Sequence, residues 1–336
     1  MNTHTISKDS IRVLNASSIK SLIPMERAIE LMGSAFKILS DKSAFVPPRV
    51  VMTSQDESMS VFFKPAFVQD YNRMSIKILT QIHNNEPSDN ATIKGMILLV
   101  DLKTGSALSL SDGTYATALR TGAASGIATQ YLANQDAATV AVFGCGAQGR
   151  TQLEAIMAVR PIQSILLFDS STIQAERLVA NMALNPDIDC QINPDLEELK
   201  TADIICTATP SKRPLFMKSQ IKTGVHINAI GSYRPDMQEL DPEILGMGKI
   251  YLDHSVACLS DSGDLLIPLN QGIIGKNDIT GELGELIGGL IPGRQNHDEI
   301  TIFKSVGSAI QDFFIANEAY EMAQGFNDSN WINFTE

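Results

Sequence analysis

Basic residues are in short supply in this chain of 336 residues: 26 lysines and arginines stand against 38 aspartates and glutamates, and the formal net charge is −12. Nucleic acids and anionic membranes are bound through clustered basic side chains, so we expect neither kind of partner. No apolar run approaches the roughly 18 residues that a membrane-spanning helix needs. Residues 1–9 also lack the apolar core of a signal peptide. We therefore expect a cytoplasmic protein.

Cysteine is scarce as well. The four cysteines are scattered without Cys-x-x-Cys spacing, at Cys145, Cys190, Cys206 and Cys258. A cytoplasmic protein keeps such thiols reduced, and we expect most of them to be buried. His226, His254 and Cys258 follow strand-like runs but lack the spacing of metal ligands. We expect no bound metal.

What the chain does have is a hydrophobic fraction of 44% beside 19% charged residues, a balance typical of a folded globular protein. Its length suits about two domains. No internal repeat or low-complexity segment interrupts it.

Residues 139–169 carry the clearest motif. Val140–Phe143 predict a buried strand that runs directly into Gly144-x-Gly146-x-x-Gly149, and apolar residues then recur at helical spacing. A glycine-rich turn between strand and helix lets the backbone approach a pyrophosphate, which the positive end of the helix attracts. A second strand ends at Asp169, whose carboxylate suits ribose hydroxyls. The motif predicts dinucleotide binding.

Different patterns lie on the two sides of this motif. Before it, short strands are predicted at 11–14, 50–52, 61–63, 75–79, 96–100 and 107–110, with a turn at 103–105 and helices that start at Pro24 and span 114–133. After it, helices at 172–184 and 309–323, the latter amphipathic, accompany strands at 202–209, 225–230 and 250–253. We predict an α/β fold: a Rossmann-type doubly wound parallel sheet plus a smaller α+β domain with a mostly antiparallel sheet.

Three basic residues stand out from their surroundings. Arg49 follows two prolines at the start of a strand, and Lys77 lies between Ile76 and Ile78, so it points to the opposite face. Either fits a solvent-facing cation or a cation directed into a cleft. Arg120 is the one charge in the small-residue helix 114–133. Because a buried unpaired charge is very costly, Arg120 needs a partner, and a ligand carboxylate is one candidate.

Several segments, taken in order, resemble the ornithine cyclodeaminase/μ-crystallin family over nearly the whole chain. They are Pro48-Arg49, Ser75-Ile-Lys77, Leu119-Arg-Thr-Gly-Ala-Ala124, Gly144-Cys-Gly-Ala-Gln148, Val225-His-Ile-Asn-Ala-Ile-Gly231, Arg234-Pro-Asp236 with Glu239-Leu240, Ser262-Gly-Asp264, Gly281-Glu-Leu-Gly284 and Phe303-Lys-Ser-Val-Gly307. The resemblance implies a homodimer. It also implies a substrate-binding and dimerisation domain over 1–118 and 304–336, and a Rossmann domain over 119–303.

The resemblance also assigns site residues by matching position. Lys77 and Arg120 would be catalytic, with Arg120 holding a substrate carboxylate by its planar fork. The substrate would contact Arg49, Lys77, Arg120, Tyr233, Arg234 and Gly307. The cofactor would contact Thr121, Gly144, Gly146, Ala147, Gln148, Gly149, Asp169, Ser170, Thr207, Ala208, Thr209, Ile230, Gly231 and Ser305.

The position of Tyr233 separates members of the family. Cyclodeaminases and the family's alanine dehydrogenases have an aspartate in this loop, whereas this chain reads Gly231-Ser-Tyr-Arg-Pro-Asp236. A tyrosine phenol is a poor base near neutral pH. Asp236 would need a different loop geometry to replace that aspartate. The Arg-Pro-Asp sequence resembles μ-crystallin and the ketimine reductases that convert 1-pyrroline-2-carboxylate to L-proline.

The expected function is therefore NAD(P)H-dependent reduction of a cyclic ketimine, 1-pyrroline-2-carboxylate first and 1-piperideine-2-carboxylate second. Hydride would reach C2 of an iminium that Arg49 and Arg120 hold, with Lys77 at the reacting carbon–nitrogen bond. Ornithine cyclodeaminase is the second hypothesis and alanine dehydrogenase the third. A non-catalytic NAD(P)H-binding protein is the fourth.

The residues after the second strand bear on the cofactor. Asp169 is followed by Ser170 and Ser171, without an adjacent arginine. A carboxylate there accepts ribose hydroxyls and repels a 2′-phosphate, so NADH is favoured over NADPH. NADPH remains an alternative, because Ser170, Ser171 or Arg150 could accommodate the phosphate.

Overall fold

The structure is a computed structural model that describes residues 10–82, 93–325 and 330–333. Residues 1–9, on which the signal-peptide expectation rests, lie outside the described residues. The chain forms two compact units. Unit 1 comprises Met1–Leu31, Asp41–Arg120 and Ser308–Glu336, and unit 2 comprises Met32–Ser40 and Thr121–Gly307.

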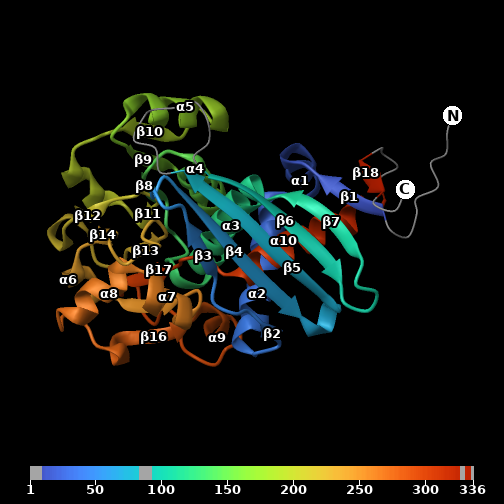
Figure 1. Ribbon diagram of the computed structural model, residues 1–336. Helices are drawn as coiled ribbons and strands as arrows, with labels where there is room; N and C mark the ends of the chain where they lie inside the picture. The colour runs from blue at the N-terminus through green and yellow to red at the C-terminus, as the bar shows by residue number, and fades with distance from the viewer. Residues whose placement is uncertain (1–9, 83–92, 326–329, 334–336) are drawn as a thin grey trace. The chain divides into compact units, whose positions relative to one another are not determined.

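Unit 1 is built on a sheet whose strands follow the order β18-β1-β7-β6-β5-β4-β2, with β3 paired to β4 (Figure 1). The strands are β1 Ser10–Leu14, β2 Ala44–Phe45, β3 Val50–Thr53, β4 Met59–Val68, β5 Arg73–Ile82, β6 Ile93–Asp101, β7 Ala107–Asp112 and β18 Trp331–Asn333. All pairs are antiparallel except β1 with β7, which confirms the predicted mostly antiparallel sheet. Gly105 takes a φ of 76° in the turn between β6 and β7, a conformation that suits glycine.

The helices of unit 1 are short except at the chain's C-terminal side. They are α1 Ala16–Leu22, the 3-10 helix η1 Gln69–Tyr71 and α10 Ala309–Ala323. Two longer helices, α2 Met25–Ser40 and α3 Gly113–Leu132, pass from one unit into the other along the chain. α2 begins directly after Pro24, as predicted, and buries Ala28, Met32 and Phe36.

The closing helix α10 departs from its prediction. Its bounds agree with the expected 309–323, but it is buried on nearly all sides in its first three turns and is not amphipathic there. It packs against β4, β5 and β6. The polar residues that would face water in an amphipathic helix, Gln311, Asp312 and Asn317, are instead buried. They tolerate burial because each meets a polar or charged partner.

Unit 2 contains an all-parallel sheet in the order β10-β9-β8-β11-β13-β17-β15-β16 (Figure 1). Its strands are β8 Thr139–Phe143, β9 Ser164–Phe168, β10 Asp189–Ile192, β11 Ile204–Thr207, β13 His226–Ala229, β15 Lys249–Leu252, β16 Ile279–Glu282 and β17 Thr301–Lys304. The chain runs outward from β8 to β10 on one side and resumes at β11 on the other. This reversal is the switch point of a doubly wound fold, so the predicted fold class is confirmed.

Helices and a small second sheet complete unit 2. The helices are α4 Ala147–Val159, α5 Thr172–Met182, α6 Pro242–Leu245, α7 Ser255–Asp261, α8 Gly263–Asn270 and α9 Leu283–Ile287, with 3-10 helices η2 Leu196–Thr201, η3 Lys218–Gln220 and η4 Lys276–Asp278. A two-stranded parallel sheet pairs β12 Lys212–Phe216 with β14 Gln238–Leu240. The sequence predictions omitted β10, β12, β14, β16 and β17, which are only three to five residues long and too short for a clear period-two pattern.

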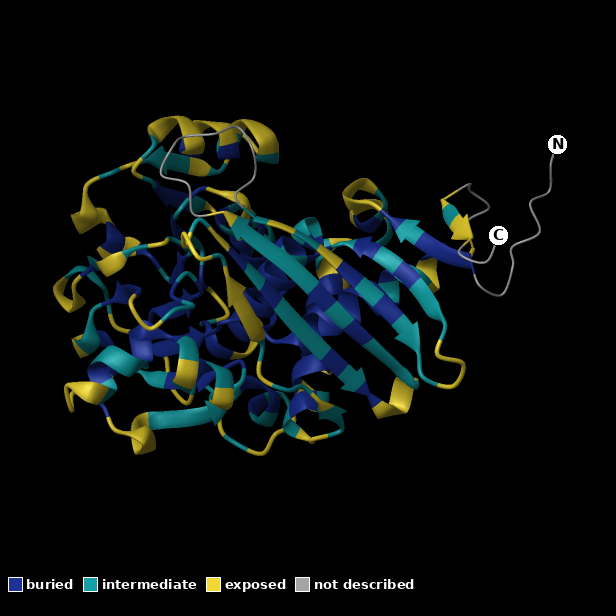
Figure 2. Ribbon diagram, in the orientation of Figure 1, coloured by how far each residue is buried: buried dark blue, intermediate teal, exposed yellow. Residues whose placement is uncertain are grey.

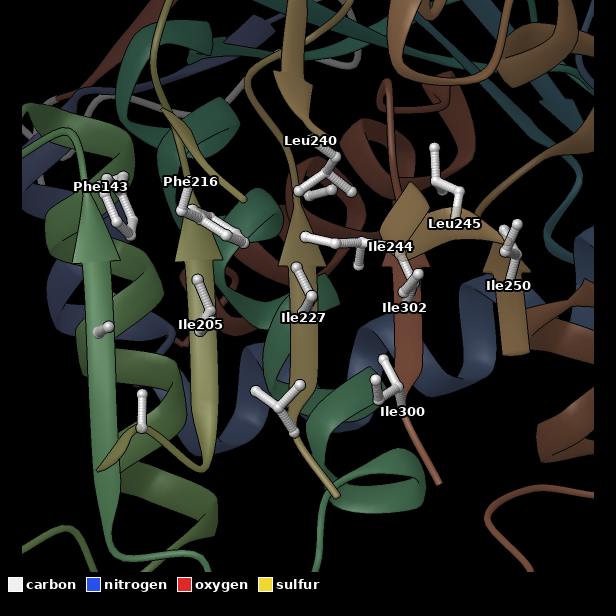
Figure 3. Close-up of a cluster of buried hydrophobic side chains, with 14 of the residues drawn as sticks. Phe143, Ile205, Phe216, Ile227, Leu240, Ile244, Leu245, Ile250, Ile300 and Ile302 are labelled. Carbon is white, nitrogen blue, oxygen red and sulfur yellow. The ribbon is translucent and has the colours of Figure 1, made fainter. Parts of the chain in front are cut away.

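The core of unit 2 follows the alternation of side chains along its strands. Phe143, Ile205 and Ile227 belong to the cluster on one face, which Figure 3 shows along neighbouring parallel strands. Val142 and Ile204 belong to the cluster on the other face. Both faces are therefore apolar, as expected for a parallel sheet covered on both sides.

Small residues let α3 and α4 approach closely. A Cβ on Gly122 would lie 2.2 Å from the Thr151 carbonyl oxygen, so only glycine fits there.

Candidate active site

The glycine-rich turn lies at the carboxyl end of β8, and each glycine has a separate reason. Gly144 has a φ of 91°, and a Cβ on it would lie 2.6 Å from the Ala208 carbonyl oxygen. A Cβ on Gly149 would lie 1.7 Å from the Gly144 carbonyl oxygen, so this glycine lets α4 begin against the turn. Gly146 is exposed and a Cβ there would meet nothing within 4 Å. Its surroundings are open to a ligand.

Asp169 follows β9 and reaches back to this turn. Its Oδ2 accepts a hydrogen bond of 2.7 Å from the Cys145 backbone N–H, and its Oδ1 accepts one of 2.8 Å from the Ser171 N–H. The carboxylate is half-buried, while Ser170 is exposed. Asp169 is thus held by the backbone of the turn with part of its surface open, which suits a ribose-binding acid.

The predicted cofactor residues after β11 and β13 meet at one buried carboxylate. Glu239 accepts hydrogen bonds from the Thr207 hydroxyl, the Thr209 N–H and hydroxyl, and the Gly231 N–H, at 2.7–2.8 Å. Burial, and secondly the nearby Asp264 carboxylate, raise the pKa of Glu239. Asp264 in turn accepts a bond of 3.0 Å from the Lys304 ammonium.

A second buried carboxylate lies one strand further along. Asp253 Oδ2 accepts bonds from the Ser305 hydroxyl at 2.6 Å and the Gly307 N–H at 2.8 Å. Cys258 donates to Oδ1 of the same side chain. The predicted residues Ser305 and Gly307 are therefore fixed in place by Asp253, at the carboxyl end of β17.

Three residues of unit 1 form a buried ionic cluster. Asp312 Oδ1 accepts hydrogen bonds from Lys77 Nζ at 2.7 Å and from Arg120 Nε at 3.0 Å. The side chains of Lys77 and Asp312 are each 1% exposed. Arg120 Nη1 donates to Gln311 Oε1, and Lys77 Nζ also donates to the Thr117 hydroxyl. The partner that the sequence required for Arg120 is thus a carboxylate of the protein itself.

Two further cations belong to this part of unit 1. Lys64 on β4 is the direct cross-strand partner of Lys77 on β5. It lies on the same strand face as Phe62, whose ring centroid is 5.4 Å from the guanidinium carbon of Arg49. Burial, and then the charges of Lys77, Arg120 and Arg49, lower the pKa of Lys64, against the opposing effect of Asp312. Unit 1 therefore contains Lys77, Arg120 and Arg49 together with Lys64, which the sequence analysis did not single out.

Burial sets the protonation of the cluster. It lowers the pKa of Lys77 to about 8, against the opposing effect of Asp312. Lys77 and Arg120 hold the pKa of Asp312 below its usual value in spite of burial. Lys77 therefore titrates close to neutral pH, which suits a group that exchanges a proton with a ligand.

Asp236 lies in the loop after β13, where two basic side chains bind it. Arg234 binds both carboxylate oxygens of Asp236 at 2.8–2.9 Å, and Lys212 binds it at 2.9 Å. These partners hold the pKa of Asp236 far below its usual range. Asp236 is exposed, and Tyr233 packs half-buried against the core of unit 2. Asp236 is ion-paired with Arg234 and Lys212. A carboxylate held in this way is not suited to act as the base in place of the missing aspartate.

His226 and Cys258, two of the positions considered for a metal, are hydrogen-bonded within the fold. His226 is buried, hydrogen-bonded to Thr301 and Asn228, and burial lowers its pKa to about 3. All four cysteines are free thiols. Within the described ranges, no three His, Cys, Asp or Glu side chains form a potential metal site. No described helix has the length and apolarity to cross a membrane.

The carboxylates Asp312, Glu239, Asp253 and Asp264 are the important residues that the sequence analysis missed. Glu239 and Asp264 lie in segments that matched the family, but nothing in their spacing showed a role. Asp312 is 192 positions from Arg120, and its helix was interpreted as amphipathic. The one available signal was the unpaired Arg120, which required an acid without showing which.

The strand order, the glycine turn and the acid after β9 define a Rossmann-type dinucleotide-binding class of fold. The family model for the ornithine cyclodeaminase/mu-crystallin family matches residues 10–327, and the chain belongs to that family.

Proteins of known name and structure align with this chain over nearly its whole length. The chain is 35% identical to a Delta(1)-pyrroline-2-carboxylate reductase of Bacillus cereus, over 96% of this chain and 99% of the relative. The solved structure of the Thermococcus litoralis Delta(1)-pyrroline-2-carboxylate reductase with NADH and L-proline has a TM-score of 0.89 at 35% identity and covers 94% and 98% of the two chains. An archaeal alanine dehydrogenase dimer with bound NAD has a TM-score of 0.89 at 33% identity and covers 97% and 99%.

Proposed function

We propose that this protein is an NADH-dependent reductase of a cyclic ketimine, with 1-pyrroline-2-carboxylate as substrate and L-proline as product. The observation that carries the proposal is the buried cluster of Lys77 and Arg120 on Asp312, with Arg49 and Lys64 beside it. Such a cluster suits a small anionic substrate. A relative of 35% identity that binds NADH and L-proline supports this choice of cofactor and product.

The residues of unit 2 fit a nicotinamide dinucleotide. Gly146 leaves open space at the start of α4, a helix of 13 residues whose N-terminus favours a pyrophosphate. Asp169 would accept the adenosine ribose hydroxyls and disfavour a 2′-phosphate, so NADH is the proposed cofactor and NADPH a weaker alternative. When bound, NADH supplies the hydride that reduces the substrate at C2.

The side chains of unit 1 would hold the substrate and its proton. Arg49 and Arg120 would bind the carboxylate, because a guanidinium matches its two oxygens. Lys77 Nζ would hold the proton that the ring nitrogen takes up, so that the carbon–nitrogen double bond gains hydrogen at both ends. Asp312 keeps Lys77 and Arg120 together. Catalysis would come chiefly from positioning.

The loop after β13 favours reduction over cyclodeamination. Expulsion of ammonia from ornithine needs a carboxylate that handles protons on the amine, and Tyr233 supplies none. Asp236 is held by Arg234 and Lys212. An alanine dehydrogenase activity is disfavoured by the same position. We keep the six-membered 1-piperideine-2-carboxylate as a second substrate.

We also propose a cytoplasmic homodimer. On β4 and β5, the face opposite Lys64 and Lys77 carries Phe63, Phe67, Ile76 and Ile78, which remain half-exposed. Figure 2 shows the alternation of buried and intermediate residues along these strands. An apolar sheet face of this kind is typical of a subunit interface, and an archaeal relative is a dimer.

The test is NADH oxidation with freshly prepared 1-pyrroline-2-carboxylate. Parallel reactions contain L-ornithine with catalytic NAD, and pyruvate with ammonia and NADH. We expect rapid oxidation with the cyclic imine and no ammonia from ornithine. Proline and ammonia from ornithine without imine turnover would establish the cyclodeaminase instead.

A further inference from the structure

Glu239 lies at the meeting point of two segments that are distant in sequence. It belongs to β14, outside the eight-stranded parallel sheet of unit 2, and is fully buried. Its Oε1 accepts from the N–H and the hydroxyl of Thr209, and its Oε2 from the Thr207 hydroxyl and the Gly231 N–H. One carboxylate therefore joins the end of β11 to the end of β13.

The backbone of Glu239 is in turn held by hydrogen bonds to Asp264. Asp264 Oδ1 accepts the N–H of Glu239 at 2.7 Å and of Leu240 at 3.0 Å, while its Oδ2 accepts from Lys304. A Cβ on Gly231 would lie 2.4 Å from Glu239 Oε1, so the loop is packed directly on the carboxylate. The close packing leaves the carboxylate little room for adjustment.

The two joined segments lie on one side of the switch point. A dinucleotide spans the crevice at the carboxyl ends of such strands, with its phosphates at the glycine turn. Asp169, at the end of β9, marks the side of the adenosine ribose. The nicotinamide half then belongs on the side of β11 and β13, whose ends Glu239 joins.

We propose that Glu239 is a positioning residue for the nicotinamide half of the cofactor, acting through the Thr207–Thr209 and Gly231 segments and touching no ligand itself. The inference rests on the proposed function only in that the cofactor is NADH. It predicts a division of labour within unit 2: Asp169 governs the adenosine half and Glu239 the nicotinamide half.

The conservative change Glu239→Gln removes this function while keeping the size of the side chain. Two of the four donors to Glu239 are backbone N–H groups, which cannot accept a hydrogen bond. In glutamine one oxygen becomes an NH₂ group, itself a donor, so one end of the side chain opposes a donor. The segments would move apart there because a buried donor left without an acceptor is unfavourable.

The experiment measures NADH and ADP affinities of the full-length protein without imine, by NADH fluorescence and by calorimetry for ADP. In Glu239→Gln we expect the NADH Kd to rise about tenfold, because a buried backbone donor loses its acceptor, while the ADP Kd stays within about twofold. Asp169→Ala should weaken ADP binding. Glu243→Gln is the matched control, because Glu243 is an exposed glutamate on α6.

Thr209→Val and Thr207→Val keep the test decisive if Glu239→Gln does not fold. Each removes one hydroxyl donor to Glu239 at nearly constant volume, and each should raise the NADH Kd by about threefold without changing the ADP Kd. Equal weakening of NADH and ADP would overturn the proposal in favour of general support of the sheet edge, and an unchanged NADH Kd would overturn it outright. Failure of imine turnover alone would contradict the proposed reaction and leave the affinity difference standing.

Discussion

Each unit of the chain buries a carboxylate among residues that we propose to serve a ligand, but the two carboxylates are stabilised in different ways. Asp312 in unit 1 meets two cations, Lys77 and Arg120. Glu239 in unit 2 meets neutral donors from backbone and hydroxyl groups. The pKa values of the two carboxylates are shifted in opposite directions. Lys77 and Arg120 lower the pKa of Asp312 in spite of burial, whereas burial raises the pKa of Glu239.

The difference shows what each acid does. Asp312 neutralises cations that we propose to bind an anionic substrate, so its charge is needed. Glu239 joins two backbone segments, so the direction of its hydrogen bonds matters more than its charge. A lowered pKa marks the acid whose ionised form the fold stabilises, and a raised pKa marks the one whose ionised form costs free energy.

Asp312→Asn is expected to have the largest effect. It leaves two buried cations without a counter-charge, which costs about 3–5 kcal/mol when one partner of a buried pair is lost. We expect a large loss of stability in urea denaturation and a fall in kcat/KM for the imine of at least about 100-fold. NADH affinity should stay within about twofold, because the proposed cofactor residues lie in unit 2.

The control for this change is Asp298→Asn, an aspartate that is exposed in unit 2. It should alter neither stability nor turnover. Asp312 is stabilised by two cations, and Glu239 by neutral hydrogen-bond donors. If Asp312→Asn proved no more destabilising than Glu239→Gln, this contrast between the two acids would be wrong.

The pH dependence of Lys77 gives a smaller but more specific effect. If Lys77 must be protonated, kcat/KM should fall above pH about 8. In Lys77→Arg this fall should disappear, because arginine stays protonated, although overall activity is lower. Titration of the free imine is the same for both enzymes, so the difference between their pH profiles isolates Lys77. Identical profiles would contradict the assignment.

The same group makes a signed contribution to stability. The pKa of Lys77 is about 8 in the folded protein and 10.5 as its ordinary value. Between these values the unfolded chain binds more protons, so the contribution of Lys77 to the free energy of unfolding rises with pH. It is fully present above pH 10.5 and is lost as the pH falls through 8. Comparison with Lys77→Met in urea at several pH values measures it.

The sequence could predict the parts of this molecule that local patterns determine. The strand, glycines, helix and acid of residues 139–169 predicted the dinucleotide fold because each feature lies within a few residues of the next. The sequence also showed that Arg120 needed a partner. It could not show that Asp312 supplies it, because a pairing across 192 positions depends on tertiary structure.

The buried polar residues were harder still. Gln311, Asp312 and Asn317 in α10 have the composition of a solvent-facing side, and only the partners Arg120, Lys77 and Arg73 allow their burial. Glu239 is one acid among 38 acidic residues, and its four donors come from three separate positions. Patterns of periodicity describe apolar burial and are silent on polar networks.

Asp169 offers the finest test of the comparison, because it is a third carboxylate, held like Glu239 by neutral donors but partly exposed. Its charge should act on the ligand and not on the fold. Asp169→Ala removes the repulsion of a 2′-phosphate, and the ratio of kcat/KM for NADH over NADPH should fall by about tenfold. Asp169→Asn keeps an acceptor for the Cys145 N–H, so it separates loss of charge from loss of the hydrogen bond. A shift shared by both variants would assign cofactor choice to charge, as expected for a partly exposed acid. A shift in Asp169→Ala alone would assign it to the shape of the glycine turn, and an unchanged ratio would remove Asp169 from cofactor selection altogether.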